Sequence, residues 1–148
     1  MELSQSKTTI FQKLAWVYAA MFIFTVSLGY IPAFTDDAGM LFGLFSIQLR
    51  DDILHLASGI WAAWAAWRSA RDSIFYFKTF GIIYSLDGLL GLITGYGYLD
   101  GGIFFAHFPV FPAFDFMTRF FANLPHIIIG GTAVFIGFVL TRKFAADA

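Results

Sequence analysis

Two apolar segments of similar design constrain what this chain can fold into. Their sequences are RDDILHLASGIWAAWAAWR at residues 50–68 and NLPHIIIGGTAVFIGFVLTR at residues 123–142. Each has a histidine one helical turn from its start and a glycine four residues later: His55 with Gly59, and His126 with Gly130. Because about 20 apolar residues in a helix match the thickness of the hydrocarbon core of a bilayer, we expect both segments to cross a membrane.

The composition supports this interpretation. Hydrophobic residues make up 59% of the 148 residues and charged residues only 13%, with a mean hydropathy of +0.73. A soluble domain carries about 25% charged residues, so this chain cannot cover a water-facing surface, and its expected partner is the lipid bilayer. The net charge of −1 gives no electrostatic footprint for nucleic acid. The lack of cysteine excludes disulfides, thiolate metal sites and covalent attachment of a c-type haem.

We expect one all-α membrane domain, residues 1–148, with four transmembrane helices. The apolar pattern places them at about residues 14–34, 52–67, 74–96 and 124–141, with outer loops at 35–51 and 97–123. The second helix is short and rich in alanine, so its hydropathy is marginal. Asn123 is expected to cap the fourth helix, with Pro125 in the first turn, where backbone amides lack partners anyway. The two outer loops are expected to pack together as a cap.

The positively charged residues predict the orientation, since cytoplasmic loops carry an excess of lysine and arginine. Seven of them lie in the N-terminal segment, the 68–78 link and the C-terminal segment: Lys7, Lys13, Arg68, Arg71, Lys78, Arg142 and Lys143. The two other loops hold only Arg50 and Arg119. Both termini are therefore expected in the cytoplasm, in a bacterial inner membrane or a thylakoid-type membrane.

The two halves of the chain resemble each other. Each half reads as a helix, a Gly-Tyr pair (Gly29-Tyr30 and Gly95-Tyr96), a turn rich in Asp or Gly, an aromatic outer segment and a returning helix headed by a histidine. Because both halves start and end on the same side, we expect a parallel repeat of two helix pairs, unlike the inverted repeat common in transporters.

Three ionisable residues are expected in the outer half of the membrane, on three different helices. At 1.5 Å per residue, His55 and His126 lie roughly 20 Å above the cytoplasmic boundary, and Asp87 lies at mid-membrane or slightly above. A charged side chain at this depth normally faces the bundle interior and has a partner. The candidate partners of Asp87 are His55, His126, Tyr84 and Ser85.

Three interpretations of these residues are open. In the first, they are structural, and each histidine bonds a loop carbonyl or Asp51 and Asp52, which attaches the outer loops to the bundle. In the second, His55 and His126 are axial ligands of haem b or ligands of chlorin pigments, because neutral imidazole coordinates metal. In the third, Asp87 lies in the path of a small transporter or channel. No separate metal ion is expected, since the spacing of the acidic residues matches no known loop geometry.

Small and aromatic residues predict contacts between helices or with a partner. The third helix has small-residue spacings that allow close approach of another helix: Gly88, Gly91 and Gly95. Trp61 and Trp64 lie deep in the second helix and are expected to pack against helices, pigment or another subunit. Trp67, beside Arg68, is typical of an anchor at the membrane interface.

The stretch LFGLFSIQLRDDILHLASGIWAA resembles a family of small bacterial and cyanobacterial four-helix membrane proteins that is classified as a domain of unknown function. That family is marked by a Gly-rich outer segment, a polar residue and a helix that starts His-Leu-x-x-Gly. The matching residues are Gly43, Asp52, His55, Leu56 and Gly59, with Asn123, His126 and Gly130 as a second copy. The resemblance covers about residues 12–142. It departs at Asp51-Asp52, where an asparagine is expected, and at the proline-containing segment 109–112, and it implies a fold but no activity.

No segment matches a catalytic motif, so we expect a protein that is not an enzyme. The expected role is that of an accessory or scaffold subunit of a larger membrane complex, for example photosynthetic or respiratory, in contact with other membrane subunits or with itself. The alternatives are a haem-binding or pigment-binding protein that uses His55 and His126, and a small transporter or channel with Asp87 in its path.

Overall fold

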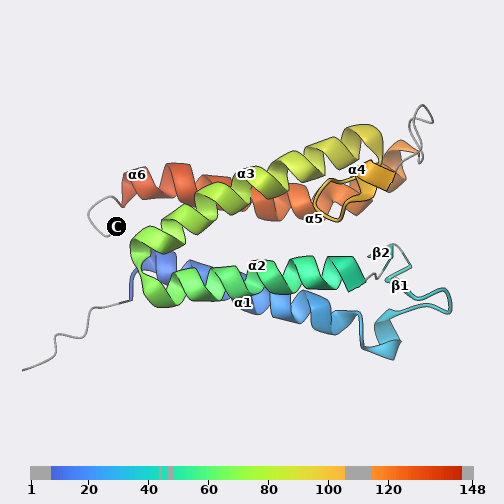
Figure 1. Cartoon of the computed structure of the whole chain (residues 1–148), viewed down its shortest axis with the longest axis horizontal. Helices are drawn as coiled ribbons and strands as arrows, with labels where there is room; N and C mark the ends of the chain where they lie inside the picture. The colour runs from blue at the N-terminus through green and yellow to red at the C-terminus, as the bar shows by residue number, and fades with distance from the viewer. Residues whose placement is uncertain (1–7, 44, 47–48, 106–114, 145–148) are drawn as a thin grey trace, which may run out of the picture.

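The computed structural model describes residues 8–43, 45–46, 49–105 and 115–144 of the chain. Its long helices are α1 (Ile10–Leu28), α2 (Leu49–Arg68), α3 (Ala70–Thr94) and α5 (Phe116–Val134), and α5 continues through a π-helical turn (Phe135–Leu140) into α6 (Thr141–Lys143) (Figure 1). The short elements are a 3-10 turn (Pro32–Phe34), an antiparallel pair of strands, β1 (Met40–Leu41) and β2 (Phe45–Ser46), and the single-turn helix α4 (Gly102–Phe105).

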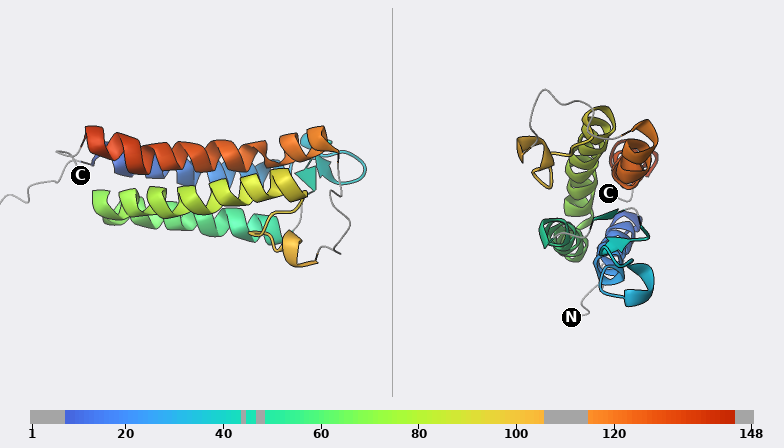
Figure 2. Two further views of the ribbon diagram at one scale, coloured as in Figure 1. Left: turned by 90° about the horizontal axis from the view of Figure 1, so that it is seen from above. Right: turned by 90° about the vertical axis from the view of Figure 1, so that its right-hand side faces the viewer.

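The bundle consists of two helix hairpins. Helix α1 packs mainly against α2, and α3 packs mainly against α5, so that the four helices stand at the corners of a rough square when seen along the long axis (Figure 2). The 3-10 turn, the two strands and α4 lie at one end of the bundle, which we call the loop end (Figure 1). The opposite end, with the α2–α3 corner and both ends of the described chain, is called the tail end.

Polar side chains and one glycine define several helix ends. Thr9 and Gln12 form a reciprocal capping box at the start of α1, and the Ser69 hydroxyl accepts a hydrogen bond from the Asp72 amide at the start of α3. Helix α3 ends at Gly95, whose φ of +86° is a conformation that residues with a side chain rarely adopt. Gly95 was expected at a helix contact, and in the structure it terminates the helix.

The last long helix begins at Phe116, well before the predicted start near residue 124. The Asp115 carboxylate is its N-cap and accepts hydrogen bonds from the amides of Met117 (2.9 Å) and Thr118 (3.1 Å). The prediction that Asn123 caps this helix is wrong. Asn123 lies inside the helix and donates from Nδ2 to the Arg119 carbonyl at 2.9 Å. The sequence pattern predicts Pro125 in the first turn, but the helix accommodates it internally at the loss of one backbone bond.

The other helix boundaries differ from the sequence pattern in simpler ways. Helix α1 ends at Leu28 because Pro32 begins the separate 3-10 turn, so the apolar run to Phe34 is not one helix. Helix α2 includes the charged residues on either side of its apolar segment, from Leu49 to Arg68. The predicted 68–78 link is almost entirely helical, since Ser69 alone separates α2 from α3.

Aromatic side chains of α1 and α3 fill the centre of the bundle. They are at most 6% exposed and pack edge to face or stacked: Tyr18, Phe22, Tyr76, Phe77, Phe80 and Tyr84. Helix α2 meets them with small residues, Ala62, Ala65 and Ala66, which are almost fully buried. Large rings on two helices and alanines on a third let the bundle close without empty space, as dense packing requires.

Three helices of the described chain are long and apolar enough to cross a membrane: Ile10–Leu28, Ala70–Thr94 and Phe116–Lys143. They indicate an integral membrane protein, in agreement with the composition. Helix α2 does not meet the same criterion, since Arg50, Asp51 and Asp52 lie at its start and Arg68 at its end. Length and composition therefore support three of the four predicted spans.

Candidate functional site

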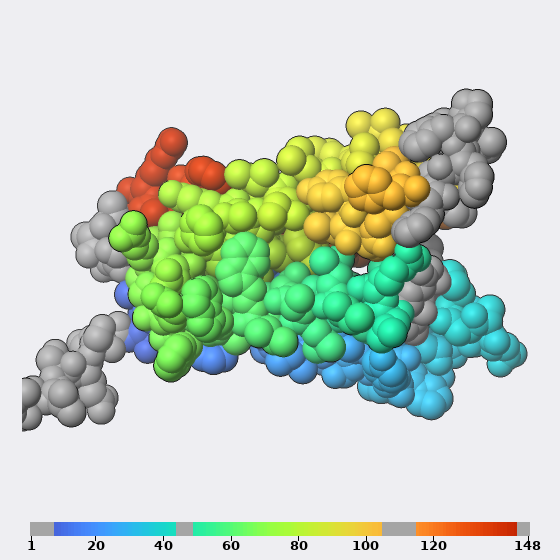
Figure 3. All heavy atoms as spheres, viewed as in Figure 1, coloured from blue at the N-terminus to red at the C-terminus, as the bar shows by residue number. Residues whose placement is uncertain are grey.

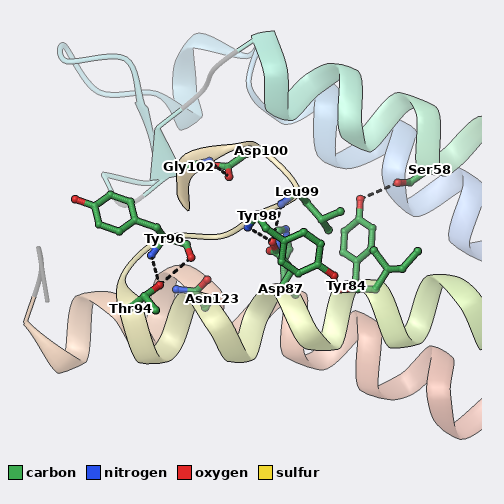
Figure 4. Close-up of polar contacts among 12 residues, drawn as sticks. Ser58, Tyr84, Asp87, Thr94, Tyr96, Tyr98, Leu99, Asp100, Gly102 and Asn123 are labelled. Atoms are coloured by element: carbon green, nitrogen blue, oxygen red, sulfur yellow. Dashed lines mark hydrogen bonds and ion pairs between the residues drawn. The ribbon is translucent and has the colours of Figure 1, made fainter. Parts of the chain in front are cut away.

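Asp87 is the centre of a polar cluster near the loop end. It lies on α3, is 2% exposed, and accepts hydrogen bonds from the backbone amides of Tyr98 (2.6 Å) and Leu99 (2.8 Å) (Figure 4). His126 on α5 provides the third partner, with Nδ1 at 2.7 Å from Asp87 Oδ2. One carboxylate thus joins α3, α5 and the connection that follows α3.

Close contact between α3 and α5 brings His126 to Asp87. A Cβ atom at Gly88 would lie 2.9 Å from the Ile127 amide nitrogen and 3.1 Å from the His126 Cβ, so no larger residue fits there without a shift. One turn further, Asn123 occupies the space over Gly91. Both glycines lie where the sequence predicts close helix approach, and the partner there is α5 of the same chain.

The two histidines lie next to each other although they come from different hairpins. The ring centroids of His55 and His126 are 6.3 Å apart and the rings are nearly perpendicular. Phe22 stacks near His55 at 5.8 Å, and Tyr84 lies edge-on to His126 at 5.1 Å. The structure therefore groups the histidines with Asp87 and Tyr84, and aromatic rings flank the pair.

Two tyrosines connect the hairpins on the tail-end side of the histidines. The Tyr84 hydroxyl and the Ser58 hydroxyl are 2.7 Å apart in a buried hydrogen bond between α3 and α2 (Figure 4). The Tyr18 hydroxyl donates to the Ile129 carbonyl at 2.8 Å, between α1 and α5. These bonds are equivalent in the two halves, because Ser58 and Ile129 each lie three residues after a histidine of the repeated pattern.

The glycine of each repeat marks a helix crossing. A Cβ at Gly59 would lie 3.1 Å from the Phe22 Cβ, and a Cβ at Gly130 would lie 2.5 Å from the Ser85 amide nitrogen. The second helix of each hairpin therefore packs closely against the first helix one turn after the histidine. This shared crossing explains why both histidines reach the same depth and meet between the hairpins.

The residues beyond the helix ends fold back onto this cluster. The Tyr98 hydroxyl donates to the Ile83 carbonyl at 2.6 Å, and partial burial, with the nearby Asp87 carboxylate, raises the pKa of Tyr98. In the first hairpin, the Tyr30 hydroxyl donates to Asp52 Oδ2 at 2.7 Å, and this bond raises the pKa of Tyr30. Each hairpin thus has a bond that holds its outer connection to a carboxylate of a helix.

Several of these participants were not predicted. Tyr98 and Leu99 act through backbone amides, which have no sequence signature, and Tyr18 and Ser58 lack charge. The repeat does indicate that Tyr18 is equivalent to Tyr84, since Tyr18 precedes Gly29 by the same interval as Tyr84 precedes Gly95. Ser85, a candidate partner of Asp87, lies instead in the contact with Gly130, and its buried hydroxyl has no hydrogen-bond partner among the described residues.

The two tryptophans singled out in the sequence have different surroundings. Trp61 packs against Tyr76, with ring centroids 5.0 Å apart, and against Phe75 at 6.5 Å. Trp64 is exposed on the outer face of α2, where the Arg68 guanidinium lies 4.8 Å from its ring centroid. Trp61 is therefore part of the contact between hairpins, and Trp64 faces outward.

The cluster is packed by aromatic rings and by its own hydrogen bonds. The ring of Phe22 lies 5.8 Å from that of His55, and the ring of Tyr84 lies 5.1 Å from that of His126. Nδ1 of His126 is bonded to Asp87, so its other ring nitrogen is the one that could bind a metal. Within the described ranges, no group of three or more His, Asp or Glu side chains is placed to hold a metal ion. A hollow beside Trp67 and Arg68 lies at the tail end, far along α2 from His55.

Comparisons with known proteins identify a family. No curated protein and no solved structure matches the chain. One family profile matches residues 12–110, which include the first hairpin with its His-Leu-x-x-Gly helix start, the whole of α3 and the connection that binds Asp87. The match confirms the resemblance to a family of unknown function over about two thirds of the chain, without the second histidine helix. The chain belongs to the family described as Domain of unknown function (DUF4383).

Proposed function

We propose that this protein spans the membrane four times, with both termini in the cytoplasm, and serves as a non-catalytic accessory or scaffold subunit of a larger membrane assembly. The proposal has two parts, the position of α2 in the bilayer and the presence of a partner. Different observations support them.

Helix α2 has an outward face suited to lipid, and its atoms form part of the surface seen in Figure 3. Its exposed large residues follow one another at steps of three or four: Ile53, Leu56, Ile60, Trp64 and Trp67. Its small and polar residues point inward, which lowers its mean hydropathy without placing charge against lipid: Asp52, Ser58, Gly59, Ala62, Ala65 and Ala66. A helix whose polar residues face the bundle can cross a bilayer even when its composition is marginal. This face supports a fourth span.

The observation that favours a partner is a glycine on the outer surface of α5. A Cβ at Gly131 would meet no atom within 4 Å, whereas Gly59, Gly81, Gly88, Gly91, Gly130 and Gly137 all lie against another helix of the chain. Exposed neighbours surround Gly131 on the same face: Ile128, Thr132 and Phe135. Because small residues allow helices to approach closely within a membrane, we propose this face as the contact with another membrane subunit or a second copy.

The polar cluster has a structural role in this proposal. Asp87 is fully engaged by two amides and His126, and Tyr84 is engaged by Ser58. Such bonds hold the two hairpins and the α3 connection in one arrangement. A rigid bundle with a glycine-containing outer face is what a scaffold requires.

Native size tests the partner. In a gentle detergent, the wild type is expected to elute as a complex larger than one chain, and Gly131→Leu should shift it toward the monomer. Ala20→Leu is the matched control, because Ala20 is an exposed small residue on a different helix, α1, and it should leave the size unchanged. A wild-type monomer would contradict the proposal, and so would a purified protein with a haem or chlorin absorption spectrum that is lost in His55→Ala.

Single cysteines test the topology without background, since the chain has none of its own. An impermeant thiol reagent is expected to label Ala38→Cys in intact cells and Phe144→Cys only after permeabilisation. Labelling of both residues from outside would refute the fourth span. Labelling of Phe144→Cys alone would refute the orientation.

A further inference from the structure

The tail end carries a surface feature that the scaffold role does not use. Trp67 and Arg68 line an open hollow of about 430 Å³ at the α2–α3 corner, and small-molecule sites commonly measure roughly 300–1,000 Å³. Trp67 is 73% exposed, and tryptophan at a membrane boundary normally inserts its ring among lipid headgroups. We propose that this hollow binds the headgroup of a zwitterionic phospholipid, phosphatidylethanolamine, and this inference rests on α2 lying in the bilayer as proposed above.

The guanidinium of Arg68 is held in place before any ligand arrives. Its Nε lies 3.2 Å from Asp72 Oδ2, and its central carbon lies 4.8 Å from the Trp64 ring centroid. The bond through Nε leaves the two terminal amino groups of Arg68 without a hydrogen bond among the described residues, and these groups match phosphate oxygens in geometry and charge. Arg68 therefore provides a preorganised site for the phosphate of a headgroup.

Asp72 gives this site its selectivity. Its Oδ2 is bonded to Arg68 and also accepts from the Ser69 hydroxyl at 2.8 Å, whereas Oδ1 has no hydrogen bond among the described residues. The primary ammonium of ethanolamine can donate to Oδ1 while the phosphate lies on Arg68. The negative phosphate of the headgroup then lies beside the Arg68 guanidinium, and the positive ammonium lies beside the Asp72 carboxylate, so that both contacts are attractive.

The same pair discriminates against other abundant lipids. The quaternary ammonium of choline has no N–H group and cannot donate to Asp72. Phosphatidylglycerol has no cation to offset the carboxylate. The partly exposed Arg68–Asp72 pair adds little to folding, as surface ion pairs rarely do, so substitution of either residue should leave the bundle folded. These differences predict that the site binds phosphatidylethanolamine more tightly than phosphatidylcholine or phosphatidylglycerol.

The experiment measures lipid retention by the full chain in detergent micelles that contain equal amounts of the three lipids, read by native mass spectrometry. The wild type is expected to retain phosphatidylethanolamine in preference to the other two. Arg68→Gln should reduce this retention roughly tenfold, as the loss of a charge-assisted contact implies. Asp72→Asn should favour phosphatidylglycerol over phosphatidylethanolamine. Arg142→Gln, an exposed arginine on α6, is the matched control and should change nothing.

Two outcomes would overturn the inference: equal retention of the three lipids by the wild type, or an unchanged preference in Arg68→Gln. The helix content of each variant, measured by circular dichroism, identifies any that fails to fold. Native mass spectrometry reads the lipids retained by each species separately, so the test does not depend on whether the chain is alone or in the partner assembly. Failure of the fourth span would appear in the cysteine labelling and can be told apart from failure of the lipid site.

Discussion

The two hairpins share one frame but fasten their outer ends by different means. Both cross at a glycine four residues after a histidine, Gly59 in the first and Gly130 in the second. In the second hairpin, the buried Asp87 binds His126 and two amides of the following connection. The position that corresponds to Asp87 in the first hairpin, counted from the Gly-Tyr pair, is Met21, a partly buried core residue. There the outer connection is held by Tyr30 and Asp52 nearer the surface.

The repeat therefore determines the helix crossings in both hairpins, whereas the bonds of Asp87 are present in the second hairpin alone. The glycine crossing positions the histidines symmetrically, so that they meet between the hairpins. The polar bonds are asymmetric, because only α3 carries a carboxylate at that depth. We therefore expect the second hairpin to depend on buried polar bonds and the first on packing.

The largest expected effect comes from removing the carboxylate of Asp87. Asp87→Ala leaves His126 and two connection amides without their acceptor, and breaking a buried pair of this kind typically costs about 3–5 kcal/mol. Asp52→Ala in the first hairpin removes one hydrogen bond from Tyr30 and should cost about 1 kcal/mol. Equilibrium unfolding in mixed micelles, followed by circular dichroism, measures both values.

An equal loss of unfolding free energy in Asp87→Ala and Asp52→Ala would show that the two outer ends are held equally strongly. It would contradict the proposed difference between the hairpins. Met21→Leu serves as the control for the position that corresponds to Asp87. It exchanges one apolar core side chain for another of similar volume, so the loss should stay below about 1.5 kcal/mol.

A second test compares the two crossings. A methyl group at Gly130 would lie 2.5 Å from the Ser85 backbone nitrogen, and one at Gly59 would lie 3.1 Å from a side-chain carbon of Phe22. At Gly130 the short distance forces a shift of backbone, whereas at Gly59 a movement of a few tenths of an ångström is enough. Gly130→Ala should therefore lose about 1–3 kcal/mol through overpacking. Gly59→Ala should lose less than half as much, in the same unfolding experiment. Gly131→Ala is the control on the open face and should be close to neutral. A larger loss at Gly59 than at Gly130 would contradict the structure.

The tyrosine bonds between hairpins give a third and smaller effect. Tyr84→Phe leaves the buried Ser58 hydroxyl without its partner, which should cost about 1 kcal/mol or slightly more. Tyr18→Phe should cost less, because the Ile129 carbonyl lies within α5 and keeps its place in the helical hydrogen-bond ladder. Thermal unfolding of the two single variants and the double variant tests this order. The reverse order, with Tyr18→Phe the more destabilising, would show that Ser58 has another partner.

Much of the fold was predictable because it depends on patterns of residue type. The membrane class follows from composition, and the helices of the described chain follow from four apolar segments. The site was predictable as a set of residues on separate helices, since an aspartate inside an apolar helix requires a partner. The structure places His126, one of the candidate partners, at 2.7 Å from Asp87.

The rest depends on features that the sequence shows weakly or not at all. The amides of Tyr98 and Leu99 can donate hydrogen bonds to Asp87 only because the connection folds back over α3. The start of the last helix is hard to predict because Pro125 resembles a first-turn residue, whereas the true cap, Asp115, lies nearly three turns earlier. The surface on Gly131 becomes visible only when the neighbours of every other helix glycine are known.

The smallest expected effect concerns the extra length of the second returning helix. Hydrogen bonds from the Thr118 hydroxyl and from backbone amides hold the pKa of Asp115 below its usual range. A depressed pKa in the folded state means that this cap contributes stability above the ordinary aspartate pKa, near 4, and loses the contribution as the pH falls from there through the folded-state value. The protection of the amides of residues 116–123 against hydrogen exchange, relative to their intrinsic rates, should therefore fall between pH 5 and pH 3. Asp115→Asn keeps a capping side chain that does not titrate, so this loss of protection should disappear. Its persistence would mean that another group, and not Asp115, holds the start of α5 in place.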